Sequence, residues 1–355
     1  MEDHSERISQ NSQRIRRLRS EIVKLDTSLL NYPGYNVGMS RTVIQNLRGA
    51  FTLALIVLNI IFWFIPILVI AVMKLAVPID GWRRITSNWL VICAENWISF
   101  NKAILSLTGN IYWDVRGLTG LRRQEWYLVV SNHQTWVDIL VLQYVFNRRV
   151  PFFKFFIKQQ LIWVPFLGLA WWALDMPFMK RYSKSELAAN PEKKGKDLET
   201  TRRACEKFQT IPTSVINFVE GTRATPEKIR RRESPYRFLL RPRSGGIAFA
   251  LGAMAGILKA MIDVTIVYAD PSFRFWDLCC GRITRVIMDI RVREIPAWIN
   301  EGDYTADTEF RQRFHRWISE IWAEKDELIA TLRSEVAAAS APKPRAELLS
   351  GTERR

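Results

Sequence analysis

The chain has 355 residues, of which 48% are hydrophobic and 14 are tryptophan, so its length fits one catalytic domain with flanking segments and its apolar content is ample for a buried core. Its formal net charge of +16 predicts polyanionic partners, namely anionic lipid headgroups, phosphorylated small molecules or nucleic acid. The four cysteines show no metal-ligand spacing, so we expect no metal site and a reducing compartment.

The first 47 residues form a polar and basic segment with one periodic feature. Apolar residues recur at alternating steps of three and four, at Ile15, Leu18, Ile22, Leu25 and Leu29. This spacing predicts an amphipathic helix with a single apolar stripe. Such a helix packs either on its own protein or a second copy, or on an anionic lipid surface, and the pattern does not choose between these.

A membrane anchor is predicted next. From Gly49 to Met73 no residue is charged over 25 positions, and a helix of this length is about 37 Å long, against a hydrocarbon layer of about 30 Å. Pro66 would kink it, which also suits a helix pair that enters and leaves one leaflet. The following run, Ile85–Leu107, carries Glu95 and Lys102, so we expect an amphipathic helix that does not cross the bilayer.

After residue 109 short β-type runs alternate with helical stretches. The β-type runs are Ile111–Arg116, Tyr127–Ser131, Ser214–Val219, Val264–Tyr268 and Thr284–Val292. The helical stretches are Thr135–Phe146, Lys196–Gln209, Gly246–Lys259 and Asp307–Leu332. This alternation predicts an α/β fold with a mixed, largely buried sheet flanked by helices.

Two segments of this part of the chain stand apart from the alternation. The apolar run Leu161–Leu174 is too short to span a membrane, and it fits either the core or a surface that dips into lipid or lines an acyl-chain groove. Residues 336–355 contain Ala, Pro, Ser and charges, and we expect a disordered tail.

The run Tyr127–Ser131 is followed by NHQTWVD, which places His133 five positions before Asp138. On one continuous helix these two side chains would point about 140° apart. They meet if His133 lies in the turn before the helix and Asp138 in its first turn, with Thr135 as the N-cap. Histidine can then take a proton from an alcohol while the carboxylate fixes its tautomer. The alternative is a capping box in which His133 has no chemical role.

Two further groups of residues have the chemistry of an anion site. Ser214–Val219 ends in Glu-Gly-Thr-Arg, where Gly221 lets the backbone approach a ligand and the planar guanidinium of Arg223 suits phosphate. Lys180 and Arg181 directly follow an apolar run. Each group alone also fits a solvated surface.

Together these motifs resemble those of the glycerolipid acyltransferase family. Residues 132–138 match its first motif, NHxxxxD, and residues 218–223 resemble its third motif, FPEGTR. Phe178 and Arg181 resemble the second motif and Val264–Tyr268 the fourth. The chain is most similar to the bacterial membrane-bound 1-acylglycerol-3-phosphate acyltransferases, especially a longer branch that reads NFVEG and PFMKRYS.

Three positions depart from the family pattern. Val219 stands where many members carry proline, no glycine precedes Phe178, and Asp263 precedes the fourth motif where a proline is common. These departures leave the chemistry intact. They put the acceptor in doubt, and the alternative is another lysophospholipid of the lysophosphatidylglycerol or lysocardiolipin type.

The resemblance implies a direct transfer without an acyl-enzyme. His133, oriented by Asp138, would deprotonate the free glycerol hydroxyl of lysophosphatidic acid, and the oxygen would attack the thioester of acyl-CoA or acyl carrier protein to give phosphatidic acid. The implied substrate-binding residues are Phe178, Lys180, Arg181, Glu220, Gly221, Thr222 and Arg223. No cofactor or metal is implied, and cytoplasmic donors imply a catalytic domain on the cytoplasmic side of the inner membrane.

The expected division of the chain is a basic segment at 1–47, a membrane anchor at 48–108, an acyltransferase domain at 109–335 and a tail at 336–355. The basic run Lys228–Arg243, with seven Lys or Arg, would attract lipid headgroups or steer coenzyme A phosphates, or form a solvated loop. A membrane-tethered nucleic-acid-binding protein is a distant alternative, because the aromatic residues cluster in apolar runs instead of alternating with cations. We expect no nucleic-acid partner.

Overall fold

The structure is a computed structural model that describes residues 37–179, 208, 211–254, 256–270, 273–304 and 306–340. Four predictions fall wholly or partly outside these residues. They are the amphipathic helix with the stripe from Ile15 to Leu29, the helix Lys196–Gln209 apart from Phe208, the positions of Lys180 and Arg181, and the tail from residue 341 onward.

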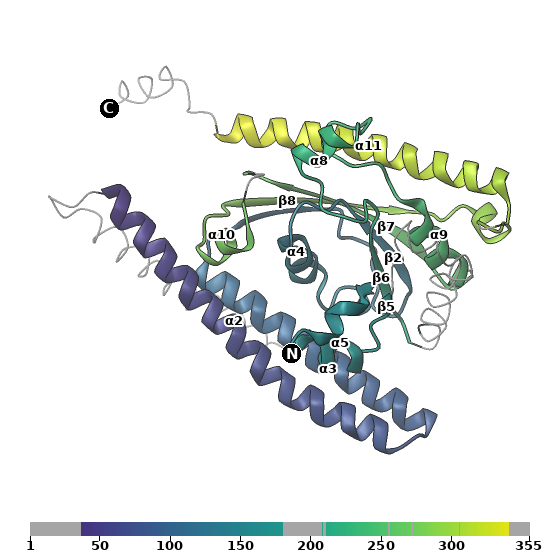
Figure 1. Ribbon diagram of the computed structural model, residues 1–355, viewed down its shortest axis with the longest axis horizontal. Helices are drawn as coiled ribbons and strands as arrows, with labels where there is room; N and C mark the ends of the chain where they lie inside the picture. Colours follow the sequence, from purple (N-terminus) through teal and green to yellow (C-terminus); the bar gives the residue numbers. More distant parts are fainter. Residues whose placement is uncertain are drawn as a thin grey trace, which may run out of the picture.

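A six-stranded sheet forms the centre of the part of the chain that follows the first two helices (Figure 1). Its strands are β1 (Tyr112–Arg116), β2 (Tyr127–Ser131), β3 (Phe153–Phe155), β6 (Ser214–Phe218), β7 (Ala260–Tyr268) and β8 (Arg285–Arg293). The spatial order is β1-β8-β7-β2-β6-β3, and every neighbouring pair is parallel except β7 with β8. A separate pair joins β4 (Ile157–Lys158) to β5 (Phe178–Met179). The predicted mixed sheet is confirmed, and β2 has the predicted bounds.

Helices cover both faces of the sheet, and the alternation along β2 shows why. Leu128 and Val130 pack in one cluster with α9 (Ser244–Ala253) and α11 (Thr308–Ser340). Tyr127 and Val129 point to the opposite face and pack with α4 (Val137–Phe146). All five side chains of β2 are buried, as expected of a strand covered on both faces.

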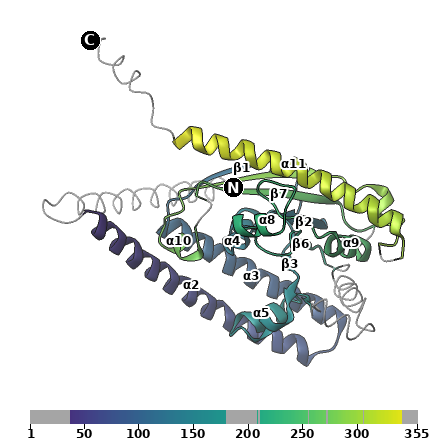
Figure 2. The same ribbon diagram turned by 45° about the horizontal axis from the view of Figure 1, so that its top comes forward.

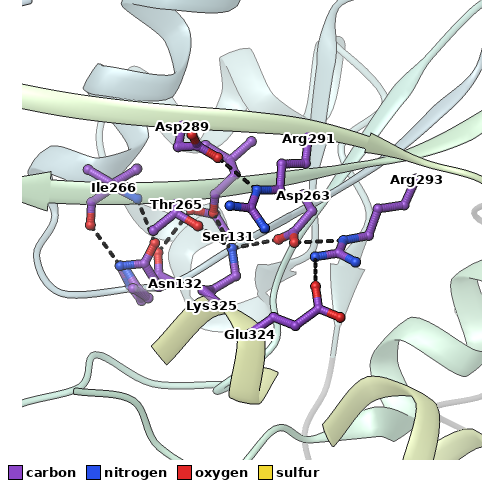
Figure 3. Close-up of polar contacts among 12 residues, drawn as sticks. Ser131, Asn132, Asp263, Thr265, Ile266, Asp289, Arg291, Arg293, Glu324 and Lys325 are labelled. Atoms are coloured by element: carbon purple, nitrogen blue, oxygen red, sulfur yellow. Dashed lines mark hydrogen bonds and ion pairs between the residues drawn. The ribbon is translucent and has the colours of Figure 1, made fainter. Parts of the chain in front are cut away.

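The C-terminal helix α11 is longer than predicted. It runs to Ser340 instead of ending at Leu332, so residues 336–340, which we expected in a disordered tail, are helical. Its Lys325 is fully buried and lies 2.5 Å from Asp263 on β7. Arg293 of β8 also pairs with Asp263 (Nε to Oδ2, 2.9 Å) and with Glu324 (2.6 Å) (Figure 3). These ion pairs thus join α11 to the middle of the sheet.

Two long helices lie side by side along one edge of the molecule, α2 (Val37–Ala76) and α3 (Asp80–Thr108) (Figures 1 and 2). α2 begins before the predicted start at Gly49, and it is the one helix in the described part of the chain that is long and apolar enough to cross a membrane. Its Asn59 reaches Asn101 of α3, with Nδ2 at 2.9 Å from Oδ1.

The polar side of α3 faces the catalytic part of the chain. Glu95 is buried and pairs with Arg123 at 2.6 Å and with Arg148 at 3.6 Å. Asn147, at the end of α4, donates a hydrogen bond from Nδ2 to the backbone oxygen of Glu95. Glu95, one of the two charges that argued against a membrane crossing, therefore joins α3 to residues that follow it in the chain.

The apolar run Leu161–Leu174 forms the 3-10 helix η1 (Gln159–Trp163) and the helix α5 (Leu167–Ala173). Part of this run belongs to the core, as the first alternative predicted, and part of it is exposed. Leu174 is buried in the cluster formed with α2 and α3, whereas Trp163 is 86% exposed. Phe166 is also exposed, and its ring meets Phe64 of α2 edge-on at 5.1 Å, so the exposed side chains of α5 continue the apolar surface of α2.

Candidate active site

The candidate site lies at the edge where three neighbouring strands, β2, β6 and β7, end. These strands are parallel to one another, so their carboxyl ends meet at one edge of the sheet. His133 follows β2, Glu220 follows β6, and Tyr268 is the last residue of β7. Ligands of open α/β sheets commonly bind at such an edge.

His133 and Asp138 are in contact, which is one of the two alternatives that their spacing left open. Nδ1 of His133 lies 2.9 Å from Oδ2 of Asp138. The same carboxylate oxygen accepts hydrogen bonds from the backbone N–H groups of Gln134 (2.6 Å) and Thr135 (2.9 Å). α4 begins at Val137 rather than at Thr135. The carboxylate therefore closes the turn and touches the imidazole at the same time, and a proton held on Nδ1 leaves Nε2 as the basic nitrogen.

Tyr268 contacts the other oxygen of the same carboxylate. Its hydroxyl donates to Oδ1 of Asp138 at 2.6 Å, and both side chains are buried. Burial holds the pKa of Tyr268 well above its usual value, so the phenol remains a donor. Sequence reasoning placed Tyr268 only at the end of the fourth motif and missed this contact.

Asn132 fixes the turn that carries His133. Its Nδ2 donates to the backbone oxygen of Ile266 at 2.9 Å, and the N–H of Ile266 donates to its Oδ1 at the same distance (Figure 3). Gln134 Nε2 also donates to the backbone oxygen of Ile266, at 2.8 Å. These side chains extend the pairing of β2 with β7 beyond the end of β2. The conformation of the turn is thus determined by β7.

Glu220 lies beneath the site instead of in its wall. The side chain is fully buried, with Oε1 accepting from the N–H of His133 (3.0 Å) and Oε2 from the N–H of Leu240 (2.8 Å). Burial raises its pKa to about 8. The family resemblance implied that Glu220 binds substrate, and its contacts instead hold the backbone of His133.

The loop after Glu220 is held in place by backbone and side-chain contacts. Gly221 has φ +66°, and a Cβ atom there would meet Arg243 Cδ at 2.9 Å. Lys228 Nζ donates to Thr222 Oγ1 (3.0 Å) and to the backbone oxygen of Arg223 (3.1 Å). Lys228 belongs to α8 (Pro226–Arg231), a short helix in the basic run that sequence reasoning did not predict.

Phe218 borders the imidazole and Arg223 contacts the neighbouring Trp136, whereas Phe178 lies elsewhere. The ring of Phe218 stacks on His133 with centres 4.1 Å apart. Arg223 is exposed, and its guanidinium carbon lies 5.4 Å from the centre of the Trp136 ring. Phe178 instead packs against the cluster formed by α2, α3 and α5. Of the predicted site residues, Lys180 and Arg181 lie outside the described part of the chain.

Other features of the structure have no part in this arrangement. A cavity of about 130 Å³ lies between α3, β1 and α4, and none of the site residues lines it. Among the described residues, no group of three His, Cys, Asp or Glu side chains is placed to hold a metal ion. His315 on α11 forms hydrogen bonds with the hydroxyl groups of Ser244 and Tyr304.

Residues 113–268, which hold the strand ends and the site, match the family model described as Acyltransferase. An uncharacterized acyltransferase of Schizosaccharomyces pombe is 22% identical over 236 residues, which are 62% of this chain and 64% of the relative. The 1-acyl-sn-glycerol-3-phosphate acyltransferase gamma of Mus musculus is 24% identical over 220 residues, 58% of this chain and 53% of the relative.

The fold is similar to that of a solved acyltransferase. The crystal structure of the 1-acyl-sn-glycerophosphate (LPA) acyltransferase PlsC from Thermotoga maritima matches with a TM-score of 0.51 at 16% sequence identity. The match covers 86% of this chain and 100% of that protein. The chain spans less than two thirds of the length of the curated relatives named above.

Proposed function

We propose that this protein transfers an acyl chain from acyl-CoA or acyl carrier protein to the free glycerol hydroxyl of lysophosphatidic acid, giving phosphatidic acid. The observation that carries the proposal is the contact between His133 Nδ1 and the buried carboxylate of Asp138, 2.9 Å apart at the carboxyl end of β2. The match of residues 113–268 to the acyltransferase family supports the reaction type, and the name of the mouse relative supports the acceptor.

In the proposed reaction the imidazole acts as a general base. Asp138 keeps the proton on Nδ1, and Nε2 takes the proton of the acceptor hydroxyl as its oxygen attacks the thioester carbonyl. A C–O bond forms and the C–S bond breaks. The proton held on Nε2 then passes to the departing thiolate. The reaction written in this way needs no cofactor or metal besides the acyl donor.

The acceptor phosphate is assigned to Arg223, with Arg181 and Lys180 as further ligands. A guanidinium binds phosphate through two parallel N–H donors, and Arg223 is exposed beside Trp136, three residues from His133 in the sequence. The basic helix α8, with Lys228, contributes a positive field that attracts anionic lipid and donor phosphates.

Two of the sequence departures carry less weight for another acceptor than they did in the sequence alone. The carboxylate of Asp263 is engaged by Lys325 and Arg293 on the side of β7 that faces α11. Val219 is buried in the cluster with α9 and α11. Both side chains are buried on the side of the sheet that faces α9 and α11, so these departures give no reason to prefer a lysophosphatidylglycerol or lysocardiolipin type over lysophosphatidic acid.

We place the protein at the inner membrane with the catalytic part on the cytoplasmic side. α2 exposes a long series of apolar side chains, among them Phe51, Leu58, Phe62, Ile65, Val69 and Val72. Anionic headgroups would neutralise part of the charge of +16. The acyl donors are cytoplasmic, which fixes the proposed side.

The decisive experiment measures acyl transfer by the full chain in lipid vesicles, with several thioester donors crossed against several lysolipid acceptors. We expect His133→Ala to lower kcat at least about a hundredfold while membrane binding and thermal unfolding stay unchanged. His315→Ala is the matched control, because this second histidine contacts Ser244 and Tyr304 instead of Asp138. Near-normal turnover of His133→Ala would refute the mechanism, and a preference for phosphodiester headgroups would replace the acceptor.

A further inference from the structure

The rim of the candidate site carries a large aromatic side chain that the proposed reaction does not use. Trp136 lies between His133 and Asp138 in the sequence, and it is 55% exposed. Its ring centre is 5.4 Å from the guanidinium carbon of Arg223. This distance is within the range of a cation–π contact, so the indole and the guanidinium attract each other.

The two residues of this stack sit on backbone segments that are tied to each other. The N–H of Ala224, next to Arg223, donates to the backbone oxygen of His133 at 2.7 Å. On the other segment, the carboxylate of Asp138 binds the N–H groups just before Trp136. Lys228 Nζ holds the backbone oxygen of Arg223. The backbone segments that carry the indole and the guanidinium are therefore held relative to each other by contacts at the turn that also carries His133.

The stack leaves Arg223 suited to a phosphate. An aromatic ring attracts one face of a guanidinium and restrains its plane, while the N–H groups at the edge stay available as donors. Among the described residues no carboxylate pairs with Arg223, unlike Arg116, Arg282 and Arg293, which all have acidic partners. A restrained, exposed arginine without a carboxylate partner fits an anion that arrives from outside.

We propose that Trp136 is a positioning residue that acts through Arg223 and sets the affinity for the phosphate of the lysophospholipid acceptor. The inference rests on the proposed function, because it assigns Arg223 to the acceptor. The same guanidinium chemistry would also suit a phosphate of coenzyme A. If Arg223 binds the acceptor phosphate, the KM for lysophosphatidic acid depends on Trp136. If it binds a phosphate of coenzyme A, the KM for acyl-CoA depends on Trp136.

The kinetic test compares Trp136→Ala with Trp136→Phe in detergent micelles at a fixed mole fraction of lysophosphatidic acid. We expect the alanine variant to raise the KM for lysophosphatidic acid three- to fivefold, roughly the worth of an exposed cation–π contact, with kcat and the KM for acyl-CoA unchanged. Phenylalanine keeps a ring and should restore most of the affinity. A fall in kcat at unchanged KM, or a rise in the acyl-CoA KM alone, would overturn the inference.

A matched control exists at the far edge of the sheet. Tyr112 on β1 is 63% exposed and has Arg285 above its ring at 5.3 Å, so Tyr112→Ala removes a similar stack three strands away from β2. We expect this variant to keep the KM of the wild type. An equal effect in both variants would show that the loss is general.

A binding measurement separates this inference from the proposed function. Calorimetry of lysophosphatidic acid with the detergent-solubilised protein, without acyl donor, needs no turnover. Weaker binding by Trp136→Ala than by the wild type supports the inference even if neither protein transfers an acyl chain, an outcome that would defeat the proposed function alone. Equal affinity of the two proteins would defeat the inference while leaving the reaction intact.

Discussion

The hydroxyl of Tyr268 and the carboxylate of Asp138 form a 2.6 Å hydrogen bond at the end of β7, on the carboxylate oxygen that His133 does not touch. Asp138 thus accepts from a phenol, an imidazole nitrogen and two backbone N–H groups. Each donor withdraws charge from the carboxylate. The phenol therefore moderates how strongly Asp138 stabilises a protonated His133.

Tyr268→Phe should change the chemistry of the base without unfolding the domain. Loss of the donor leaves the buried Oδ1 of Asp138 without its hydroxyl partner, so the carboxylate should orient His133 less well. We expect kcat at neutral pH to fall several-fold with the acceptor KM unchanged. Tyr236→Phe is the control, because the hydroxyl of Tyr236 donates to the backbone of Ser319. A kcat equal to that of the wild type would contradict the role given to Tyr268.

Glu220→Gln should loosen the backbone of His133. Each side-chain oxygen of Glu220 accepts one backbone N–H. In glutamine an NH₂ group replaces one of these oxygens and cannot accept from the N–H that faces it. One hydrogen bond is therefore lost, at a cost of about 1–3 kcal/mol. We expect kcat to fall about tenfold. Retention of full activity and stability by this variant would mean that the contact with His133 is dispensable.

The same variant has a pH signature in stability. Because burial raises the pKa of Glu220 to about 8, the folded protein keeps a proton here that the unfolded chain loses near the ordinary value. The contribution of Glu220 to the free energy of unfolding therefore falls as the pH rises from the ordinary pKa of a glutamate toward about 8. Thermal unfolding in detergent at pH 5, 6.5 and 8 should show the advantage of the wild type over Glu220→Gln shrinking with pH. A difference in thermal stability between the wild type and Glu220→Gln that stays constant from pH 5 to pH 8 would contradict the raised pKa of Glu220.

The features that sequence analysis predicted well are local ones. β2 and the contact between His133 and Asp138 depend on a strand, a turn and the first turn of a helix within a dozen residues. Tyr268, by contrast, meets Asp138 only because β7 lies beside β2, across 130 residues of sequence. The burial of Glu220 likewise depends on Leu240, which no local pattern placed.

Two differences in helix length have a physical reason. The C-terminal helix continues past Leu332 because residues 337–339 are alanine, the best helix former, and the next proline is Pro342. We had interpreted this composition as a tail. The start of α2 at Val37 instead of Gly49 shows that polar residues extend the helix beyond its apolar part, which a search for charge-free runs does not detect.

The exposed aromatic side chains of η1 and α5 should strengthen membrane binding. Phe166 meets Phe64 of α2, and Trp163, three residues earlier, is 86% exposed, so replacing both by serine removes two large apolar groups from the proposed lipid-facing surface. We expect co-sedimentation with anionic vesicles to weaken about tenfold or more, with kcat in detergent unchanged. Val292→Ser, an exposed apolar position on β8, is the control. Unchanged vesicle binding of the double variant would argue that this surface does not face lipid.

The buried pair of Lys325 and Asp263 should behave as a coupled unit that joins α11 to the sheet. Lys325→Met removes the cation at 2.5 Å from Asp263 and the donor to the backbone oxygen of Val264, and it leaves a buried carboxylate with Arg293 alone. Breaking such a pair costs about 3–5 kcal/mol, so the midpoint of thermal unfolding in detergent should drop markedly. Adding Asp263→Asn removes the uncompensated charge, and the double variant should lose less than the sum of the two single variants. Strict additivity would show that the two charges act independently, and α11 would then be held by its apolar contacts alone.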